Sequence, residues 1–282
     1  MKNKLKLTIA QIAPRFGDID SNIKTHLECI DKAIDSGSDL IIFPELALSG
    51  YSLKDLATTV SLRTDDIKLD ALREASKKIA IVTSFPELGS DFVSHISMAM
   101  FIDGKIMSLY RKVHPPTHGM FEELKYFGSG DSIAAFDTPF ARVGMMICRD
   151  IWHPELAYVL SVDGAYLMMA SSAIPARNLS GGGFGIDDSM TRTTRNMAST
   201  NQSWVVLCNR VGVEEGVTFL GGSMVCSPNG AIVHKLPLLE EDIATIEIDF
   251  DQIRKTRDSL NLVRERKNRL ILSELERILK KC

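Results

Sequence analysis

Cys148 is the residue whose position most clearly suits chemistry. It directly follows the apolar segment 143–147, and polar residues follow it at once. A cysteine at a strand end, shortly before a helix that begins near Pro154, has the placement of an exposed nucleophile on a tight strand-to-helix turn. The alternative is a buried structural cysteine, the usual fate of a free thiol. Cys208 and Cys226, each inside an apolar segment, are expected to be of that structural kind.

Two further reactive side chains stand at predicted strand ends. Glu45 follows the apolar segment 40–43, and Lys112 lies at the end of a predicted hairpin strand, 105–113. Functional groups are common where a rigid strand continues into a loop. Taken singly, a surface carboxylate and a solvated lysine explain these two residues as well as a catalytic role does.

Together, the three segments resemble the nitrilase, or carbon–nitrogen hydrolase, superfamily. Its signature is a strand-end glutamate, a lysine after a hairpin and a cysteine at a strand-to-turn junction, in that order. The matching stretches are 43–51 (FPELALSGY), 111–115 (RKVHP) and 147–150 (ICRD). The stretch 121–127 is similar to the one that holds the family's second glutamate, which falls on Glu123. Further matches lie at 195–202, 209–212 and 221–230. Motifs in order over nearly the whole chain make chance a poor explanation.

The resemblance implies amide hydrolysis at a cysteine, without metal or cofactor. Cys148 would attack a carbonyl and form a thioester, with Glu45 taking the thiol proton and later donating one to the leaving amine. Lys112 and the backbone N–H of Arg149 would stabilise the oxyanion. Glu123 would orient Lys112 or the substrate amine, and two neighbouring carboxylates should raise the pKa of one of them. The residues expected to bind the substrate are Arg149, Tyr51 and Trp152.

The residue after the cysteine guides the choice among family activities. Nitrilases of the family commonly have tryptophan there, whereas this chain has Arg149. An arginine beside the nucleophile suits a substrate carboxylate, and a surface ion pair explains it equally well. The motifs around Glu45 and Cys148 look closest to the amidase- and glutaminase-like branches of the superfamily. The sequence therefore favours a small amide or N-carbamoyl substrate. The alternatives are a nitrilase acting on a small organic nitrile, and a non-catalytic binding or regulatory protein of the same fold.

Other reactive groups favour simpler interpretations. His153 is five residues from the cysteine, on the same short turn, and is expected to make a local hydrogen bond. His114 and His118 have the spacing of metal ligands on a helix, but the prolines between them argue against a helix. The glycine-rich run 180–185 lacks the lysine and hydroxyl residue of a phosphate-binding loop. We expect no metal site, and a mobile loop near the pocket at 180–185.

The elements that must position these groups alternate along the chain. Strands are predicted at 5–12, 40–43, 80–84, 142–148, 165–170, 204–209 and 243–248, and helices at 22–36, 69–79, 155–161 and 188–202. Hairpins are predicted at 94–102 with 105–113 and at 223–227 with 231–235, through turns at Asp103-Gly104 and Pro228-Asn229-Gly230. Because hairpins add antiparallel pairs, an α/β fold with two mixed sheets and outer helices is expected. The resemblance implies a four-layer α-β-β-α sandwich.

The composition of the chain limits the partners and the cellular compartment that we expect. The formal net charge is −3 and no basic run stands out, so no nucleic-acid partner is expected. No apolar run approaches the length of a membrane span, and the apolar N-terminal stretch alternates like a strand, so neither a membrane segment nor a signal peptide is predicted. Five scattered cysteines without close pairs favour a reducing compartment, the cytoplasm.

One domain is predicted for residues 1–282, with a helical tail from about 251 to 282. Apolar residues recur in that tail at near-helical spacing, at Leu270, Leu272, Leu275, Ile278 and Leu279. Such a stripe can pack on its own subunit. In the family that this chain resembles, the tail reaches a neighbouring subunit. The resemblance therefore implies a homodimer or higher homo-oligomer.

Overall fold

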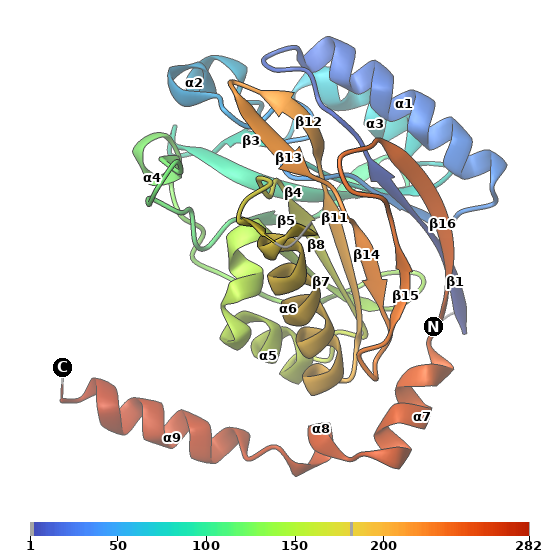
Figure 1. The fold of residues 1–282 in the computed structure, drawn as a ribbon, viewed down its shortest axis with the longest axis vertical. Coiled ribbons are helices and arrows are strands. Elements are labelled where there is room, and N and C mark those ends of the chain that lie inside the picture. Colours follow the sequence, from blue (N-terminus) through green and yellow to red (C-terminus); the bar gives the residue numbers. More distant parts are fainter. Residues whose placement is uncertain (1–2, 181–182, 282) are drawn as a thin grey trace.

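The structure, a computed structural model, describes residues 3–180 and 183–281 of the chain (Figure 1). Two six-stranded sheets dominate this part. The first has the strand order β16 (Asp242–Asp249), β1 (Lys4–Gln11), β2 (Leu40–Ile42), β3 (Ala80–Leu88), β4 (Ser94–Ile102), β5 (Lys105–Arg111). Strands β1, β2 and β3 are parallel, and the other three pair antiparallel to their neighbours.

The second sheet repeats this plan. Its order is β15 (Ile232–Lys235), β14 (Met224–Cys226), β11 (Trp204–Asn209), β8 (Leu167–Ser172), β7 (Arg142–Ile147), β6 (Phe136–Asp137). Strands β7, β8 and β11 are parallel, and antiparallel strands extend both sides. Two short antiparallel pairs stand apart from the sheets: β9 (Leu179–Ser180) with β10 (Gly183–Phe184), and β12 (Val211–Glu214) with β13 (Val217–Leu220).

Helices cover the outer faces of both sheets (Figure 1). The described helices are α1 (Ile19–Asp35), α2 (Ala57–Val60), α3 (Asp70–Ala75), α4 (Glu123–Tyr126), α5 (Pro154–Val162), α6 (Gly185–Asn201), α7 (Asp251–Ser259), α8 (Leu262–Glu265) and α9 (Asn268–Leu279). Helices α1 and α3 lie on the first sheet, and α5 and α6 lie on the second.

Successive side chains along the central strands face opposite sides of each sheet and so contribute to two different cores. In β2, Leu40 and Ile42 face the core between the sheets, whereas Ile41 faces the core beneath α1 and α3. In β7, Met145 faces the central core and Met146 the core beneath α5 and α6. Each such side chain contributes roughly 1.5–3 kcal/mol by leaving water. The predicted α/β fold, a four-layer α-β-β-α sandwich with two mixed sheets, is confirmed.

Most predicted elements appear within a few residues of their expected ends. The hairpin around Asp103-Gly104 is present as β4 and β5. Helix α1 starts earlier than predicted, because the side chain of Asp18 caps it by accepting a hydrogen bond from the N–H of Ser21 at 3.0 Å.

The predicted helix 69–79 is wrong beyond Ala75. Ser76 leaves the helix to hold the neighbouring hairpin turn: its carbonyl accepts from the N–H of Asp103 at 3.1 Å, and its Oγ accepts from the N–H of Gly104 at 3.0 Å. A tertiary contact, which sequence periodicity does not report, ends this helix.

The hairpin β12–β13 was not predicted. Its turn residues Glu215 and Gly216 have φ values of +49° and +76°, the backbone of a tight two-residue hairpin turn. The hairpin continues from the end of β11, and the N–H of Val211 donates to the carbonyl of Ile12 at 3.1 Å. It therefore adds a projection to the end of the sandwich.

The C-terminal segment consists of α7, α8 and α9. In Figure 1, α9 lies apart from the two sheets, and its apolar residues are exposed, with Leu272 at 59% and Leu275 at 52%. Arg266, which lies between α8 and α9, holds this segment against α5 and α6. It donates to Ser161 Oγ at 2.8 Å and to Asn201 Oδ1 at 2.8 Å. Among the described residues, no helix has the length and apolar character needed to cross a membrane.

Candidate active site

The segments that carry Glu45, Lys112 and Cys148 follow β2, β5 and β7 and meet at one end of the sandwich. Two hydrogen bonds join the sheets there. Ser171 Oγ, near the end of β8, donates to the carbonyl of Phe43 at 2.8 Å, and the N–H of Glu45 donates to the carbonyl of Ser172 at 3.4 Å. The end of β2 is thus fixed against the second sheet, which carries the cysteine.

Lys112 lies between two buried carboxylates. Its Nζ is 2.7 Å from Oε1 of Glu45 and 2.6 Å from Oε2 of Glu123. Lys112 and Glu45 are fully buried, and Glu123 is 6% exposed. Taking charges out of water is costly even when they pair. Three ionisable groups gathered in this way are therefore a candidate functional site.

The neighbouring charges shift the pKa values of Lys112 and Glu123. Burial alone would lower the pKa of Lys112, but Glu123 and Glu45 outweigh it and raise the pKa above its ordinary value. The lysine is therefore an ammonium. Burial raises the pKa of Glu123 to about 7; the charge of Lys112 opposes that shift and the charge of Glu45 adds to it.

Cys148 occupies a left-handed turn directly after β7. Its φ is +45°, a conformation rare for residues other than glycine and often found where a side chain must be held for function. Burial, and next the charge of Glu45, raise the pKa of its thiol well above the ordinary value, although Lys112 and a backbone hydrogen bond from Ala173 oppose this. The resting group is a neutral thiol that needs a base when it attacks.

Asp150 ties the cysteine turn to the strand that leads to Lys112. It is fully buried. Its Oδ2 accepts from the hydroxyl of Tyr110 at 2.7 Å and from the N–H of Ile147 at 3.2 Å. Its Oδ1 accepts from the N–H of His114 at 2.9 Å. Because Tyr110 and His114 flank Lys112 at two residues on either side, this one carboxylate fixes the lysine segment relative to the nucleophile.

A cavity of about 290 Å³ opens at Cys148. Arg149 and Trp152, both expected at the substrate, line it. Tyr51 does not: with Glu123 it lines a neighbouring pocket of about 60 Å³, and its hydroxyl donates to Oε1 of Glu123. Of the three residues expected to bind substrate, the structure brings two to the cavity of the cysteine.

Residues 6–258 match the family model for carbon–nitrogen hydrolases. The chain belongs to this family. The predicted membership of the nitrilase superfamily is confirmed.

The relatives of this family member have several different activities. The chain is 32% identical to the glutamine-dependent NAD(+) synthetase of Thermotoga maritima over 254 residues, 88% of this chain but only 43% of that protein. It is 28% identical to the N-carbamoylputrescine amidase of Oryza sativa over 284 residues, 93% of this chain and 92% of that protein. The fold also matches the amidase of Nesterenkonia sp. AN1, with a TM-score of 0.82 at 20% identity, covering 96% and 97% of the two chains.

The site includes residues that the sequence analysis did not predict. Arg177 lines the cavity of Cys148, and its guanidinium carbon is 4.8 Å from the centre of the Phe121 ring. The sequence motif includes Asp150 but assigns it no role, and no motif marks Glu214. An arginine in a loop gives no signal of its own, but alternation on either side of Glu215-Gly216 could have revealed the hairpin that holds Glu214.

Two other features of the molecule lie outside the cluster of Lys112, Glu45 and Glu123. A larger hollow, about 550 Å³, lies on the outer surface at α5 and α6, and its described lining does not include the cysteine. The glycine-rich run was predicted as a mobile loop near the pocket. Residues 181 and 182 are outside the described residues, whereas its neighbours Asn178 and Ile186 do line the cavity.

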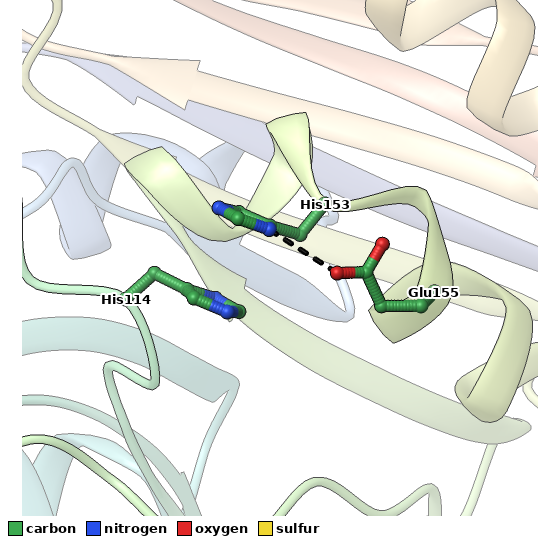
Figure 2. Close-up of side chains that lie close together, drawn as sticks. All are labelled: His114, His153 and Glu155. Atoms are coloured by element: carbon green, nitrogen blue, oxygen red, sulfur yellow. Dashed lines mark hydrogen bonds and ion pairs between the residues drawn. The ribbon is translucent and has the colours of Figure 1, made fainter. Parts of the chain in front are cut away.

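His114, His153 and Glu155 lie close together beside the site (Figure 2), with potential ligand atoms within 4.8 Å of one another. The two imidazole rings stack with centroids 3.6 Å apart and planes 3° from parallel. An imidazole nitrogen binds a metal ion through a lone pair that lies in the plane of the ring. The lone pairs of two stacked, parallel rings therefore do not point at one ion. His153 Nδ1 instead lies 3.2 Å from Oε1 of Glu155, a local hydrogen bond of the kind expected for His153. His118 contacts Phe121 and lines the cavity, away from this stack.

Proposed function

We propose that this chain hydrolyses the C–N bond of a small amide or N-carbamoyl compound through a thioester on Cys148. The observation that carries the proposal is Lys112 held between Glu45 and Glu123, beside a cysteine in a left-handed turn. The full-length similarity to an N-carbamoylputrescine amidase supports this substrate class. No cofactor or metal takes part in the proposed reaction.

Glu45 acts as the base in the first step. Its Oε2 is buried and has no hydrogen-bond partner among the described residues, so it is available to accept a proton. The thiol of Cys148 transfers its proton to Glu45 as the sulfur attacks the substrate carbonyl. The carbonyl oxygen becomes an oxyanion, which the ammonium of Lys112 and the backbone N–H of Arg149 stabilise.

The same carboxyl group completes the reaction. As the tetrahedral intermediate collapses, the C–N bond breaks and Glu45 gives its proton to the leaving nitrogen, which departs as ammonia or an amine. Water then transfers a proton to Glu45 and attacks the thioester, the C–S bond breaks, and the sulfur recovers the proton from Glu45. Glu123 holds Lys112 in place throughout, and no net proton is left on the enzyme.

The charge of the cavity points to an anionic group on the substrate. Arg149 and Arg177 both line it, and no carboxylate is among its described lining residues. Guanidinium groups bind carboxylates through paired, charge-assisted hydrogen bonds. We therefore propose an amide or carbamoyl compound that carries a carboxylate at its far end, in preference to a simple nitrile.

A matched pair of substrates tests this proposal. Glutaramic acid has a carboxylate and its methyl ester has none, while both offer the same amide. The wild-type enzyme should prefer the acid. Arg149→Met and Arg177→Met should each raise KM for the acid by roughly 10–100-fold, the value of a charged hydrogen bond, and should leave the ester unaffected. Arg192→Met, on the outer surface, is the control. Equal use of acid and ester, or faster hydrolysis of a nitrile than of any amide, would overturn the substrate class.

Ammonia release tests the reaction itself. Cys148→Ala should abolish it, whereas Cys226→Ala, a buried cysteine of β14, should retain it at a cost in stability of about 1–2 kcal/mol. A folded wild-type protein that released no ammonia from amides, carbamoyl compounds or nitriles would favour a binding or regulatory role.

We also propose that the protein is a homodimer or higher homo-oligomer in the cytoplasm. The exposed apolar residues of α9, among them Leu270, Leu272 and Leu275, support assembly. Free cysteines, as found at Cys29 and Cys208, suit a reducing compartment.

A further inference from the structure

A buried ion pair outside the catalytic cluster supports the backbone of Tyr51. Nη1 of Arg210 donates to Oε2 of Glu214 over 2.9 Å, and the two residues are 1% and 6% exposed. Oε1 of Glu214 accepts hydrogen bonds from the N–H groups of Tyr51 at 2.8 Å and Ser52 at 2.6 Å. A buried ion pair is weak evidence for stability, because each charge loses its hydration. A role in the site next to it is a better explanation.

The chain passes close against the Glu214 carboxylate just before Tyr51. Gly50 has a φ of +79°, and a Cβ atom there would lie 2.6 Å from Oε2 of Glu214 and 2.9 Å from Cα of Phe16. No side chain fits in that space. The glycine therefore allows Glu214 to receive the two N–H groups that follow it.

The same hairpin also contacts the ring of Tyr51. The guanidinium carbon of Arg210 is 4.1 Å from the centre of the Phe219 ring. Phe219 meets Tyr51 edge to face, with centroids 5.6 Å apart and planes at 69°. Glu214 lies on β12 and Phe219 on β13, the hairpin beyond the end of β11 (Figure 1). The hairpin thus holds Tyr51 at both its backbone and its ring.

Tyr51 in turn reaches the catalytic cluster. Its hydroxyl donates to Oε1 of Glu123, whose Oε2 is 2.6 Å from Nζ of Lys112. We infer that Glu214, held by Arg210, is a positioning residue that fixes Tyr51 and, through it, the Glu123 carboxylate that holds the lysine. This inference rests on the proposed thioester mechanism. Glu214 is absent from the described lining of the cysteine's cavity, so it should affect turnover rather than substrate binding.

Glu214→Gln tests the role with little change in shape. The amide must turn its NH₂ group toward Arg210 or toward the two backbone N–H groups, and either choice places donor against donor. We expect kcat to fall by roughly 10–100-fold, as for a small misplacement of a catalytic group, with KM changed less than about twofold. The acid limb of kcat/KM should move to higher pH. Glu215→Gln, the exposed neighbour on the same hairpin, should change none of these.

A double-mutant cycle separates positioning from a general structural role. If Glu214 acts through Tyr51, Glu214→Gln should lower kcat by less than about twofold in a Tyr51→Phe enzyme. The same fold loss in both backgrounds would refute the inference.

Folding and the parent mechanism need separate controls. Arg210→Met combined with Glu214→Met removes both charges and the acceptor for the N–H groups of Tyr51 and Ser52, so no unpaired charge stays buried; it should show the same loss in kcat, and full activity would also refute the inference. Ammonia release by Cys148→Ala would instead refute the proposed function, leaving the two failures distinguishable.

Discussion

Asp150 accepts a 2.7 Å hydrogen bond from the hydroxyl of Tyr110 and so joins the two sheets at the point where chemistry is proposed. Asp150 is two residues after the cysteine, and Tyr110 is two residues before Lys112. Nucleophile and ammonium arise from different sheets, and their relative position depends on this buried contact. A thioester mechanism requires both to face the same carbonyl group.

Tyr110→Phe removes this contact without a change in shape. Asp150 would keep its bonds from Ile147 and His114, so the protein should fold, with a loss of about 1–2 kcal/mol in the free energy of unfolding. We expect kcat to fall by roughly tenfold through misplacement of Lys112. Urea unfolding and steady-state kinetics measure the two effects. Tyr166→Phe, a half-buried tyrosine beside α7, is the control and should keep full turnover.

The pH dependence of kcat/KM should report Glu123. Lys112 is best held by an anionic Glu123, and the pKa of Glu123 is raised to about 7. Activity should therefore fall as pH drops through about 7. The hydrogen bond from Tyr51 stabilises the anion and so lowers this pKa. Tyr51→Phe removes this hydrogen bond and should move the acid limb of kcat/KM to higher pH. A shift of that limb to lower pH would contradict its assignment to Glu123.

The reactivity of Cys148 should be that of a thiol with a raised pKa. Burial and the charge of Glu45 disfavour the thiolate, so the rate of alkylation by iodoacetamide should rise steadily with pH up to at least pH 9. Peptide mapping by mass spectrometry would follow the reaction at Cys148 alone. A rate already at its plateau at pH 6 would indicate a preformed thiolate and would remove the need for Glu45 as base.

The terminal helix should contribute to assembly. Light scattering at micromolar concentration should give at least twice the chain mass of 31.2 kDa, because α9 exposes an apolar face that needs a partner surface. Truncation after Ile253 should weaken the assembly. Leu272→Lys, which changes one side chain, should weaken it as well. A stable, fully active monomer at these concentrations would count against the proposed oligomer.

Sequence reasoning was most successful where local pattern and backbone geometry coincide. The hairpin of β4 and β5 follows from alternation around Asp103-Gly104, and the placement of Cys148 follows from an apolar strand that stops at a polar turn. The order of the motifs along the chain is enough to link Glu45, Lys112 and Cys148, because motif order is a property of the sequence.

What sequence could not supply is the set of contacts between segments far apart. Helix α3 ends early because of a hydrogen bond from a hairpin turn nearly thirty residues later. Arg177 gives no sign in the sequence that it lines the cavity. Glu214 holds Tyr51 across 163 positions. Such pairings depend on how distant segments of the chain pack together, which no local pattern encodes.

The covalent intermediate tests the central proposal most directly. The enzyme should be mixed with excess amide substrate, quenched in acid within milliseconds to seconds, digested and analysed by mass spectrometry. We predict an acyl group, of the mass of the substrate without its leaving amine, on the peptide that contains Cys148. Cys148→Ala should show neither the adduct nor turnover. Hydrolysis by Cys148→Ala at the wild-type rate, or an acyl group trapped on another residue, would contradict the account.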